Sequence, residues 1–399
     1  MSARGAVGLV GDFGVGNYGN EASLAAMLGA LAERGVRDVV VVADTPERVR
    51  EEHGVRAVRL EVPAGPGPVG RVVGKARQVL HLLRTARRAR ALVVPGTGIL
   101  EGVWIEAGGL PLTLCVLGVG ARLARRRYDL VAIGVDLAGS RPTRWLFGAT
   151  LRLATSVSVR DVRSADAAVE LGLPRRPPVV PDLAFGLPPV DPSGAGVPAA
   201  AGRPAFVGVG VMDYAGRDVR RSDAAQRRYE ERVVALVGEL LERSWAVHLV
   251  PGAEPDLAAT ARVAAAVAER RPGAPVTVSA ARTYDEVVAE LSGARAVVAS
   301  RYHTVVAGLA AGVPVVPFGY GPKQDALVTS FGLPPGADID TFVPAELAAL
   351  VAEAVRRRDV LAADVGGHLA RARAALAAEH DRIAGALRGD APRKREVAA

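Results

Sequence analysis

Three cationic side chains, Arg301, His303 and Lys323, lie within one short stretch of the sequence. Arg301 and His303 follow an apolar run, residues 296–299, and Lys323 follows a second apolar run, residues 313–318. Both runs have the composition of buried strands, and a small-residue helix is expected between them. Because ligands of open α/β sheets bind beyond the carboxyl ends of the strands, this order predicts that the three cations meet at one anion. The pattern is that of an anionic-substrate site.

His303 is the candidate for proton transfer at this site. A lone histidine is more often structural, but this one lies two residues from Arg301 and one small helix from Lys323. His248 falls within a strand pattern and is expected in the core or at its rim. No histidine and carboxylate pair has the spacing of metal ligands, so no metal site is predicted. The remaining histidines are expected to be solvated: His53, His81, His368 and His380.

A glycine-rich segment, residues 11–21, follows the first predicted strand and opens a helix. Glycines there allow a tight turn and the close approach of an anionic ligand to the helix N-terminus. The spacing also fits a dinucleotide fingerprint, although no acidic residue closes the second strand convincingly. A glycine-rich turn that packs without a ligand is the third interpretation. The residues expected to contact substrate here are Gly14, Gly16, Asn17, Gly19, Asn20 and Glu21.

Further polar motifs follow predicted strands. Residues 158–161 end one strand and begin a helix, so Arg160 is expected either to project into a cleft or to form an interdomain ion pair with Asp161. Asp182, at the last strand of the first half, could bind a ligand, cap a turn or do neither. Residues 95–98 form either a glycine-rich lip over the same crevice or a simple loop.

The positive charge of the chain comes almost entirely from arginine. The chain has 399 residues, half of them apolar, and a net charge of +8. With the abundant alanine, this composition indicates the coding bias of a GC-rich genome. Aromatic residues are sparse and no module that recognises bases is present, so nucleic-acid binding is not expected. Attraction to an anionic substrate or to an anionic membrane surface is compatible with the charge.

Cysteine usage and hydropathy predict a cytoplasmic protein. Cys115 is the only cysteine, which excludes an internal disulfide and a cysteine-rich metal site, and it lies in an apolar, strand-like run where burial is expected. That run, residues 110–119, is too short to span a bilayer. The chain enters a strand at residues 6–10 with no pattern of a signal peptide. Membrane contact, at the inner membrane face, is therefore expected to be peripheral at most.

Strand-like and helical patterns alternate along the chain in two series. The predicted strands span residues 7–10, 39–42, 92–94, 130–134 and 156–159 in the first series and 205–209, 246–250, 276–278, 296–299 and 313–318 in the second. Each series predicts a parallel sheet covered by helices on both faces. The expected fold is α/β, with two Rossmann-like domains facing a central cleft and a helical C-terminal tail. The predicted boundaries are residues 1–187 for the first domain, 188–203 for a Pro/Gly/Ala-rich linker, 204–343 for the second domain and 344–399 for the tail.

The ordered set of motifs resembles the polysaccharide pyruvyltransferase family. The resemblance covers about residues 7–333, and it is the order of the motifs that is specific, since each motif alone is weak. The motifs are Gly16-Asn17-Tyr18-Gly19-Asn20-Glu21-Ala22, Ser158-Val159-Arg160-Asp161 with Ser164, Pro181-Asp182-Leu183-Ala184-Phe185, Ser300-Arg301-Tyr302-His303 and Gly319-Tyr320-Gly321-Pro322-Lys323.

The resemblance implies a GT-B-like fold and a transfer of pyruvate from phosphoenolpyruvate to two hydroxyls of a sugar, which gives a cyclic ketal. It implies that His303, Arg160 and Lys323 are catalytic and that Arg301 and Tyr320 contact substrate. Phosphoenolpyruvate is then a co-substrate, and no cofactor is expected. The first domain would provide the acceptor side and part of the donor site, and the second domain the rest of the donor site. The acceptor would be a sugar or glycan, with a lipid-linked or nucleotide-linked intermediate among the candidates.

The sequence departs from the family pattern at two places. Asn20 stands where the family commonly has an aspartate, and Thr97 interrupts a run of glycines. Two other functions therefore stay open from the sequence. One is a GT-B glycosyltransferase that uses a nucleotide-sugar, and the other is a catalytically silent family member that binds a glycan.

Overall fold

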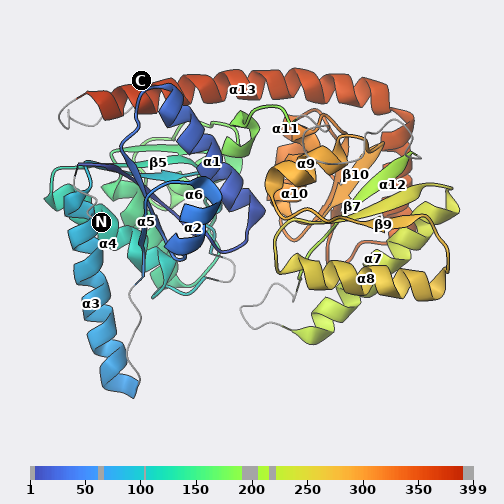
Figure 1. The fold of residues 1–399 in the computed structure, drawn as a ribbon, viewed down its shortest axis with the longest axis horizontal. Helices are drawn as coiled ribbons and strands as arrows, with labels where there is room; N and C mark the ends of the chain where they lie inside the picture. The colour runs from blue at the N-terminus through green and yellow to red at the C-terminus, as the bar shows by residue number, and fades with distance from the viewer. Residues whose placement is uncertain (1–4, 62–66, 103–104, 191–204, 215–221, 390–399) are drawn as a thin grey trace. The chain divides into compact units, whose positions relative to one another are not determined.

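The computed structural model describes residues 5–61, 67–102, 105–190, 205–214 and 222–389, and these residues form two compact units (Figure 1). Unit 1 contains residues 1–15, 23–186 and 375–399, and unit 2 contains residues 16–22 and 187–374. The predicted linker, residues 188–203, lies largely outside the described residues. By this division, residues 16–22, which include the first turn of the first helix, belong to unit 2, and the end of the last helix belongs to unit 1.

Unit 1 is built on a six-stranded parallel sheet in the order β3-β2-β1-β4-β5-β6. The strands are β1 (Val7–Val10), β2 (Val39–Ala43), β3 (Ala57–Arg59), β4 (Ala91–Pro95), β5 (Arg127–Ile133) and β6 (Ser156–Val159). Runs of valine and leucine make β1, β2 and β4 buried along their whole length, as expected for parallel strands covered on both faces. β3 was not predicted, because it has three half-exposed or exposed residues and therefore no buried run.

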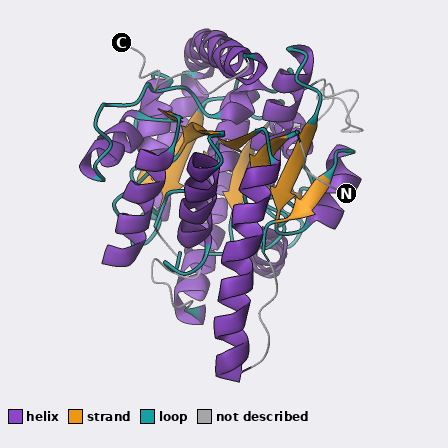
Figure 2. Cartoon of the chain, turned by 90° about the vertical axis from the view of Figure 1, so that its left-hand side faces the viewer, coloured by secondary structure: helices purple, strands orange, loops and turns teal. Residues whose placement is uncertain are grey.

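Helices cover both faces of this sheet (Figure 2). They are α1 (Tyr18–Glu33), α2 (Pro46–His53), α3 (Gly67–Arg88), α4 (Leu110–Leu123), α5 (Arg141–Leu153), α6 (Val162–Glu170) and a 3₁₀ turn at Leu183–Gly186. The strand order reverses beside β1, and right-handed crossovers then place α1 and α2 on one face and α3, α4 and α5 on the other. On that second face α3 packs along α4, and α4 packs along α5.

The expectation of a strand-like run at residues 110–119 is wrong, because these residues begin α4. A continuous apolar run has no period that separates a buried strand from a buried helix. Pro111 starts the helix, where a missing N–H costs nothing, and Gly118 lets the ring of Tyr128 approach the helix backbone. Cys115 is buried on this helix, and burial raises the pKa of its thiol.

Unit 2 repeats the architecture with a second six-stranded parallel sheet, in the order β12-β11-β10-β7-β8-β9. Its strands are β7 (Phe206–Val211), β8 (Ala246–Pro251), β9 (Val276–Val278), β10 (Ala296–Ala299), β11 (Val315–Gly319) and β12 (Ala337–Asp338). His248 lies in β8 and is buried, with Nε2 3.0 Å from the Glu290 carboxylate. β12 has two residues and no strand pattern of its own, so the sequence did not predict it.

The helices of unit 2 fix where the predicted site residues lie. They are α7 (Asp223–Glu242), α8 (Asp256–Arg270), α9 (Tyr284–Leu291), α10 (Tyr302–Ala310), α11 (Lys323–Ser330), α12 (Pro344–Arg356) and the long α13 (Arg358–Arg388). α10 begins earlier than its apolar pattern predicts, so His303 lies in its first turn. Lys323 is the first residue of α11, although a glycine- and proline-rich loop was expected there. No helix within the described residues is long and apolar enough to cross a membrane.

The helical tail was predicted, and its last part, residues 375–388, belongs to unit 1. The carboxylate of Glu379 accepts a hydrogen bond of 2.7 Å from the hydroxyl of Ser158 in β6. The expectation that His380 is solvated is wrong, because its side chain is buried. Burial and the nearby positive charge of Arg34 lower the pKa of His380.

Candidate functional site

Arg301 lies just beyond the carboxyl end of β10, where its guanidinium is held by a buried carboxylate. Its Nε and Nη2 donate to the two oxygens of Asp256, each at 2.6 Å. Asp256 is fully buried and also accepts hydrogen bonds from the backbone N–H groups of Asp213 and Gly252. Burial alone would lower the pKa of Arg301, but the Asp256 carboxylate raises it above the ordinary value. Asp256 therefore fixes the orientation of the Arg301 guanidinium and engages its Nε and Nη2 atoms.

Tyr302 brings His303 and Lys323 together. The imidazole of His303 meets the Tyr302 ring edge to face, with ring centroids 5.3 Å apart. The ammonium of Lys323 lies 5.8 Å from the centroid of the Tyr302 ring and 4.8 Å from that of Tyr320. Contacts of this kind between a cation and an aromatic face are favourable, most of all where water is excluded. Two predicted catalytic residues and the predicted substrate-binding Tyr320 thus form one cluster at the N-terminal turns of α10 and α11.

The glycine-rich loop contributes to this cluster through Gly19. A Cβ atom placed on Gly19 would overlap the imidazole ring of His303, so only glycine allows the first turn of α1 to pack on the histidine. Residues 16–22 are attached to unit 2 by backbone pairing as well: Asn17 bridges Ala253, and the N–H of Glu254 donates to the carbonyl of Gly16 at 2.9 Å.

The other residues of the loop shape its backbone. Gly14 and Gly16 both have positive φ values, 77° and 76°, which side chains rarely tolerate. The side chain of Asn17 accepts a hydrogen bond from the N–H of Gly19, and its carbonyl accepts from Asn20 and Glu21. Asn20 is buried and Glu21 is half-buried. The segment is therefore a preorganised turn in which Gly19 approaches a predicted catalytic side chain.

Arg160 lies in unit 1, inside a cluster of carboxylates. Its side chain is 1% exposed, and it forms ion pairs with Glu101, with Asp182 at 3.5 Å and with Asp161 at 3.8 Å. Gly134 makes room for the pair with Glu101, because a Cβ there would overlap the Glu101 carboxylate. These three carboxylates belong to unit 1, as Arg160 does, so the three ion pairs are not interdomain contacts.

Asp161 and Asp182 also organise the backbone around this cluster. Asp161 caps α6, accepting from the N–H and the hydroxyl of Ser164 at 2.7 and 3.0 Å, and Asp182 accepts from the N–H of Ala184 at 3.1 Å. Residues 95–98 turn sharply nearby: Thr97 has a positive φ of 63°, an uncommon value for a side-chain-bearing residue, and its carbonyl accepts from the N–H of Gly134.

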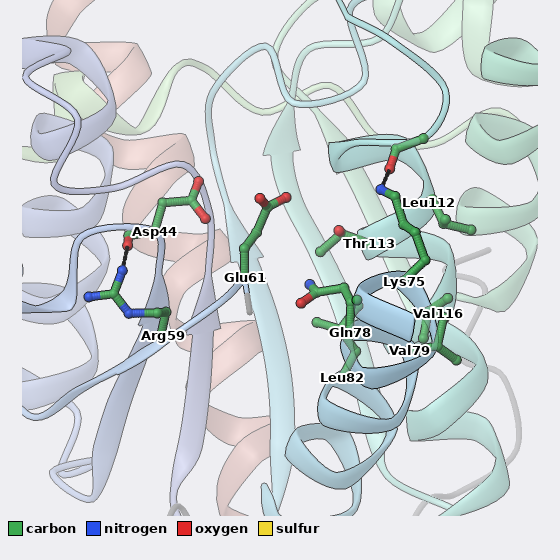
Figure 3. Close-up of a pocket in the computed structure, with 12 residues that line it drawn as sticks. Asp44, Arg59, Glu61, Lys75, Gln78, Val79, Leu82, Leu112, Thr113 and Val116 are labelled. Atoms are coloured by element: carbon green, nitrogen blue, oxygen red, sulfur yellow. Dashed lines mark hydrogen bonds between the residues drawn. The ribbon is translucent and has the colours of Figure 1, made fainter. Parts of the chain in front are cut away.

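A cavity of about 360 Å³ opens in unit 1, beyond the carboxyl ends of β2 and β3 and against α3 and α4 (Figure 3). Its polar lining comes from Asp44, Arg59 and Glu61 on the strand side and from Lys75, Gln78 and Thr113 on the helix side. Arg59 donates to the carbonyl of Asp44 at 3.3 Å, Lys75 to the carbonyl of Gly108 at 2.5 Å and Gln78 to the carbonyl of Leu60 at 3.1 Å. Both donors and acceptors therefore line one hollow.

Asp44 is electrostatically unusual in this cavity. Burial, the charges of Asp12 and Glu61 and a hydrogen bond with the Asp12 side chain raise the pKa of Asp44 to about 7. Its Oδ1 is buried and has no hydrogen-bond partner among the described residues. The carboxyl therefore takes up and releases a proton close to neutral pH, which is the property expected of groups at functional sites.

Several residues of these sites were missed in the sequence. Asp256 lies far from Arg301 in the chain, at the start of an ordinary helical pattern, so nothing marked it as a partner. Glu101 and Asp12 are acidic residues in loops with no distinctive spacing. Tyr302 was part of a motif, but its aromatic ring was not expected to hold the two cations. Asp44 was noticed only as a poor match to the dinucleotide motif, although its position directly after a buried strand is a usable signal.

The two parallel sheets, with polar residues gathered beyond their carboxyl ends, define an α/β protein of the GT-B-like class. Solved structures with this fold include HepE from Anabaena in complex with UDP-glucose, with 13% identity, a TM-score of 0.60 and coverage of 96% of this chain and 98% of that one. S. aureus MnaA with UDP has 10% identity, a TM-score of 0.59 and coverage of 90% of each chain. A UDP-N-acetylglucosamine 2-epimerase has 11% identity, a TM-score of 0.61 and coverage of 99% of each chain. At these identities the similarity shows the fold alone.

The sequence assigns the family within that class. The polysaccharide pyruvyl transferase family matches residues 17–322, well over half of the chain. The chain belongs to the polysaccharide pyruvyl transferase family, which confirms the resemblance seen in the motifs. No curated protein matches the chain in sequence.

Proposed function

We propose that the protein transfers pyruvate from phosphoenolpyruvate to two hydroxyls of a sugar or glycan, forming a cyclic ketal. Membership of the pyruvyl transferase family supports the type of reaction. The observation that carries the choice of donor is the cluster of His303 and Lys323 around Tyr302 at two helix N-termini. Helix N-termini and cations together favour a small, multiply charged anion. Phosphoenolpyruvate, with a phosphate and a carboxylate, is such an anion.

In this proposal Lys323 neutralises one anionic group of the donor. An ammonium on the first residue of a helix adds to the positive end of the helix dipole, so it acts as a point charge beside the first N–H groups of α11. Arg301 is 20% exposed, and the part of its fork not held by Asp256 is available for the second anionic group. Because Asp256 fixes the guanidinium before a ligand binds, little side-chain entropy is lost on binding.

His303 moves the proton in the proposed reaction. Protonation of the methylene carbon of phosphoenolpyruvate gives an oxocarbenium-like centre at the carbon that bears the phosphate. The oxygen of one sugar hydroxyl forms a bond to this carbon and loses its proton. The C–O bond to phosphate then breaks with its electron pair on the leaving phosphate. The second hydroxyl forms the other ketal bond to the same carbon, and its proton goes to that phosphate. The scheme needs no metal and no redox partner, and a histidine suits both the donation and the uptake of protons.

The predicted catalytic role of Arg160 stays a prediction. Its guanidinium already has three carboxylate partners, so binding a donor anion would require at least one of them to be exchanged. Without that exchange, the residue holds Glu101 and Asp182 in place.

We assign the cavity in unit 1 to the sugar acceptor. Sugars bind through many hydroxyl hydrogen bonds, and the lining offers carboxylates, an amide, a hydroxyl and an arginine within one hollow. In this proposal Asp44→Asn raises the KM for the acceptor and leaves donor binding unchanged, since no residue of the Tyr302 cluster lines the cavity.

The test is to incubate the protein with phosphoenolpyruvate labelled in its pyruvyl carbons and a panel of glycans, including lipid-linked and nucleotide-linked ones. The expected result is label in a glycan product with release of inorganic phosphate. The structures of HepE and MnaA, which contain UDP-glucose and UDP, make nucleotide-sugars the alternative donors to compare. A melting temperature raised by a nucleotide-sugar but unmoved by phosphoenolpyruvate would overturn the proposal in favour of a glycosyltransferase. Binding of glycans without turnover of either donor would instead indicate a silent family member.

A further inference from the structure

The layer formed by α3, α4 and α5 in unit 1 carries charge of one sign only. Residues 67–88, 110–126 and 141–153 contain twelve lysines and arginines and no aspartate or glutamate. The whole chain has a net charge of +8, so the residues outside this layer have a net charge of −4, and the excess of positive charge lies in the layer. The twelve cations are Arg71, Lys75, Arg77, Arg84, Arg87, Arg88, Arg122, Arg125, Arg126, Arg141, Arg144 and Arg152.

These cations face solvent and are not neutralised. All twelve are exposed, and within the described ranges of the chain none of them forms an ion pair with a carboxylate. Lys75 and Arg152 donate only to backbone carbonyls, of Gly108 and Leu171. Arginines elsewhere in unit 1, such as Arg48 and Arg176, do have carboxylate partners. The layer is therefore a concentrated positive surface.

Large apolar side chains are exposed on the same layer. Leu123 of α4 is 75% exposed, Val72 of α3 is 71% exposed and Trp145 of α5 is 65% exposed, and Val73, Leu80 and Val119 add to them. In contrast, neither α1 nor α2, the helices of the opposite face, has an exposed large apolar residue in the part of the chain that the structure describes. Exposed leucine and tryptophan are costly in water unless another surface covers them.

The exposed residues of α3 form a continuous stripe. Val72, Ala76 and Leu80 are four residues apart and lie on one side of the helix, with Arg84 and Arg87 continuing it toward the C-terminal end. The first turns of α3 extend beyond the rest of unit 1 in both ribbon views (Figures 1 and 2). An apolar stripe bordered by arginines on a projecting helix is the pattern of a helix that lies in the plane of a membrane interface.

We propose that the α3–α5 layer binds the surface of a membrane that contains anionic lipids. The arginines pair with lipid phosphates, while Trp145, Leu123 and Val72 enter the headgroup region, where an indole is favourably placed. A second copy of the chain does not fit, because two such layers would oppose twelve cations with twelve cations. Nucleic acid does not explain the exposed aliphatic residues, and Trp145 is the only aromatic residue exposed on the layer for stacking on bases. The proposal does not depend on the pyruvyl transfer reaction.

The test uses the full chain and measures co-sedimentation with vesicles of phosphatidylcholine alone or mixed with phosphatidylglycerol. Strong binding to the mixed vesicles, weak binding to the neutral ones and a loss of binding with rising salt are expected. Arg77→Glu with Arg84→Glu should lower the partition coefficient more than tenfold, because each basic residue near the surface contributes several-fold. Leu123→Ser with Trp145→Ser should lower it with little change in salt dependence.

Matched controls separate the surface from general charge and hydropathy. Arg175→Glu with Arg270→Glu changes the net charge by the same amount at exposed positions outside the layer, and Val343→Ser with Val360→Ser removes comparable exposed apolar groups. Both controls should bind as the parent does. The proposal is overturned if the controls lose binding equally, if neutral and anionic vesicles bind alike, or if the chain prefers double-stranded DNA to anionic vesicles. Self-association that the layer variants abolish, without vesicle binding, would also overturn it.

Discussion

At the scale of residues, Gly19 constrains the side chain of His303, the candidate for proton transfer. The imidazole is buried in the first turn of α10, and the backbone of Gly19 fills the space beside it. The glycine therefore limits the orientations that the histidine can adopt. A geometry of this kind is what acid–base catalysis requires, since a misplaced proton donor loses most of its effect.

His303→Gln should preserve the fold and most of the affinity for phosphoenolpyruvate but reduce kcat by on the order of a hundredfold or more, the usual contribution of general acid–base catalysis. Turnover at saturating donor and melting curves of the variant and the parent check this. His81→Gln, a half-buried histidine of unit 1, serves as the control. A variant that melts earlier yet turns over at the parental rate would show that His303 only packs.

Gly19→Ala should displace the His303 ring, because the added methyl group would overlap it. We expect kcat to fall by on the order of tenfold or more, with a modest loss of stability. Gly29→Ala is the matched control on the same helix: its Cβ would meet nothing within 4 Å. Since alanine is the better helix former, this control should gain up to about 1 kcal/mol of stability and keep its activity. Equal activities of the two variants would contradict the role of Gly19.

Asp44→Asn should change how stability depends on pH. The folded-state pKa of Asp44 is raised to about 7, so the folded protein holds a proton that the unfolded chain releases near pH 4. Asp44 therefore contributes to the free energy of unfolding at low pH, and this contribution is lost as the pH rises from about 4 to about 7. Melting temperatures across this range should fall less steeply for the variant than for the parent. A slope identical to that of the parent, and to that of the surface control Asp166→Asn, would contradict the raised pKa.

At the scale of elements, strand ends carry nearly all the polar residues that could do chemistry. Arg301 follows β10, Lys323 follows β11, Arg160 follows β6 and Asp44 follows β2. Parallel sheets place these ends at one edge, which is why the motifs could be found from the order of apolar runs. The environments of these residues differ: Lys323, the first residue of α11, is half-buried, while Arg160 is buried.

Arg160→Ala should therefore behave as a stability variant. Its removal takes the guanidinium away from carboxylates that are buried or nearly so, and breaking a buried ion pair typically costs about 3–5 kcal/mol. Urea denaturation measures this loss. Arg163→Ala, an exposed arginine one turn away, should change stability by no more than about 0.5 kcal/mol. Parental stability of Arg160→Ala would show that the carboxylates do not need the Arg160 guanidinium.

Lys323→Ala should leave the unfolding midpoint unchanged but weaken phosphoenolpyruvate binding.

The sequence allowed the sheets to be predicted better than the contacts. Strands such as β1 and β10 are uninterrupted apolar runs bounded by glycine or polar residues, so their type and order followed directly. α4 was misassigned because a helix buried on most sides has no amphipathic period. Pairs such as Arg301 with Asp256 depend on the tertiary fold, and no local pattern specifies them. His380 was expected in solvent, yet its side chain is buried, because it lies on the face of α13 that packs.

At the scale of the whole molecule, the two units share one plan: six parallel strands with a reversal of order beside the first strand of each series. Each is large enough for its own core. Neither is a continuous piece of chain, since residues 16–22 cluster with unit 2 and residues 375–399 with unit 1. Long-range contacts of this kind link the stability of each unit to a distant part of the sequence.

Ile383→Ala should test that link. Ile383 is fully buried in the part of α13 that belongs to unit 1, and a buried isoleucine truncated to alanine costs about 2–5 kcal/mol. Hydrogen exchange should then speed up in β5 and β6 of unit 1 and stay unchanged in β7 and β10 of unit 2. Leu350→Ala, at an exposed position of α12, should leave both unchanged. Faster exchange confined to unit 2 would contradict the assignment of this helical segment.

The late segment of α13 also sets the order in which the nascent protein can mature on the ribosome. Synthesis is vectorial, and domains tend to fold as their residues emerge. Unit 2 has all of its residues once position 374 has been made, whereas unit 1, translated first, must wait for residues 375–388 to cover its last apolar surface. Unit 1 is thus synthesised first but completes its fold last. During that interval unit 1 exposes apolar surface of the kind that chaperones bind. We expect chains released by ribosomes that stall before residue 375 to be cleaved by proteases within unit 1.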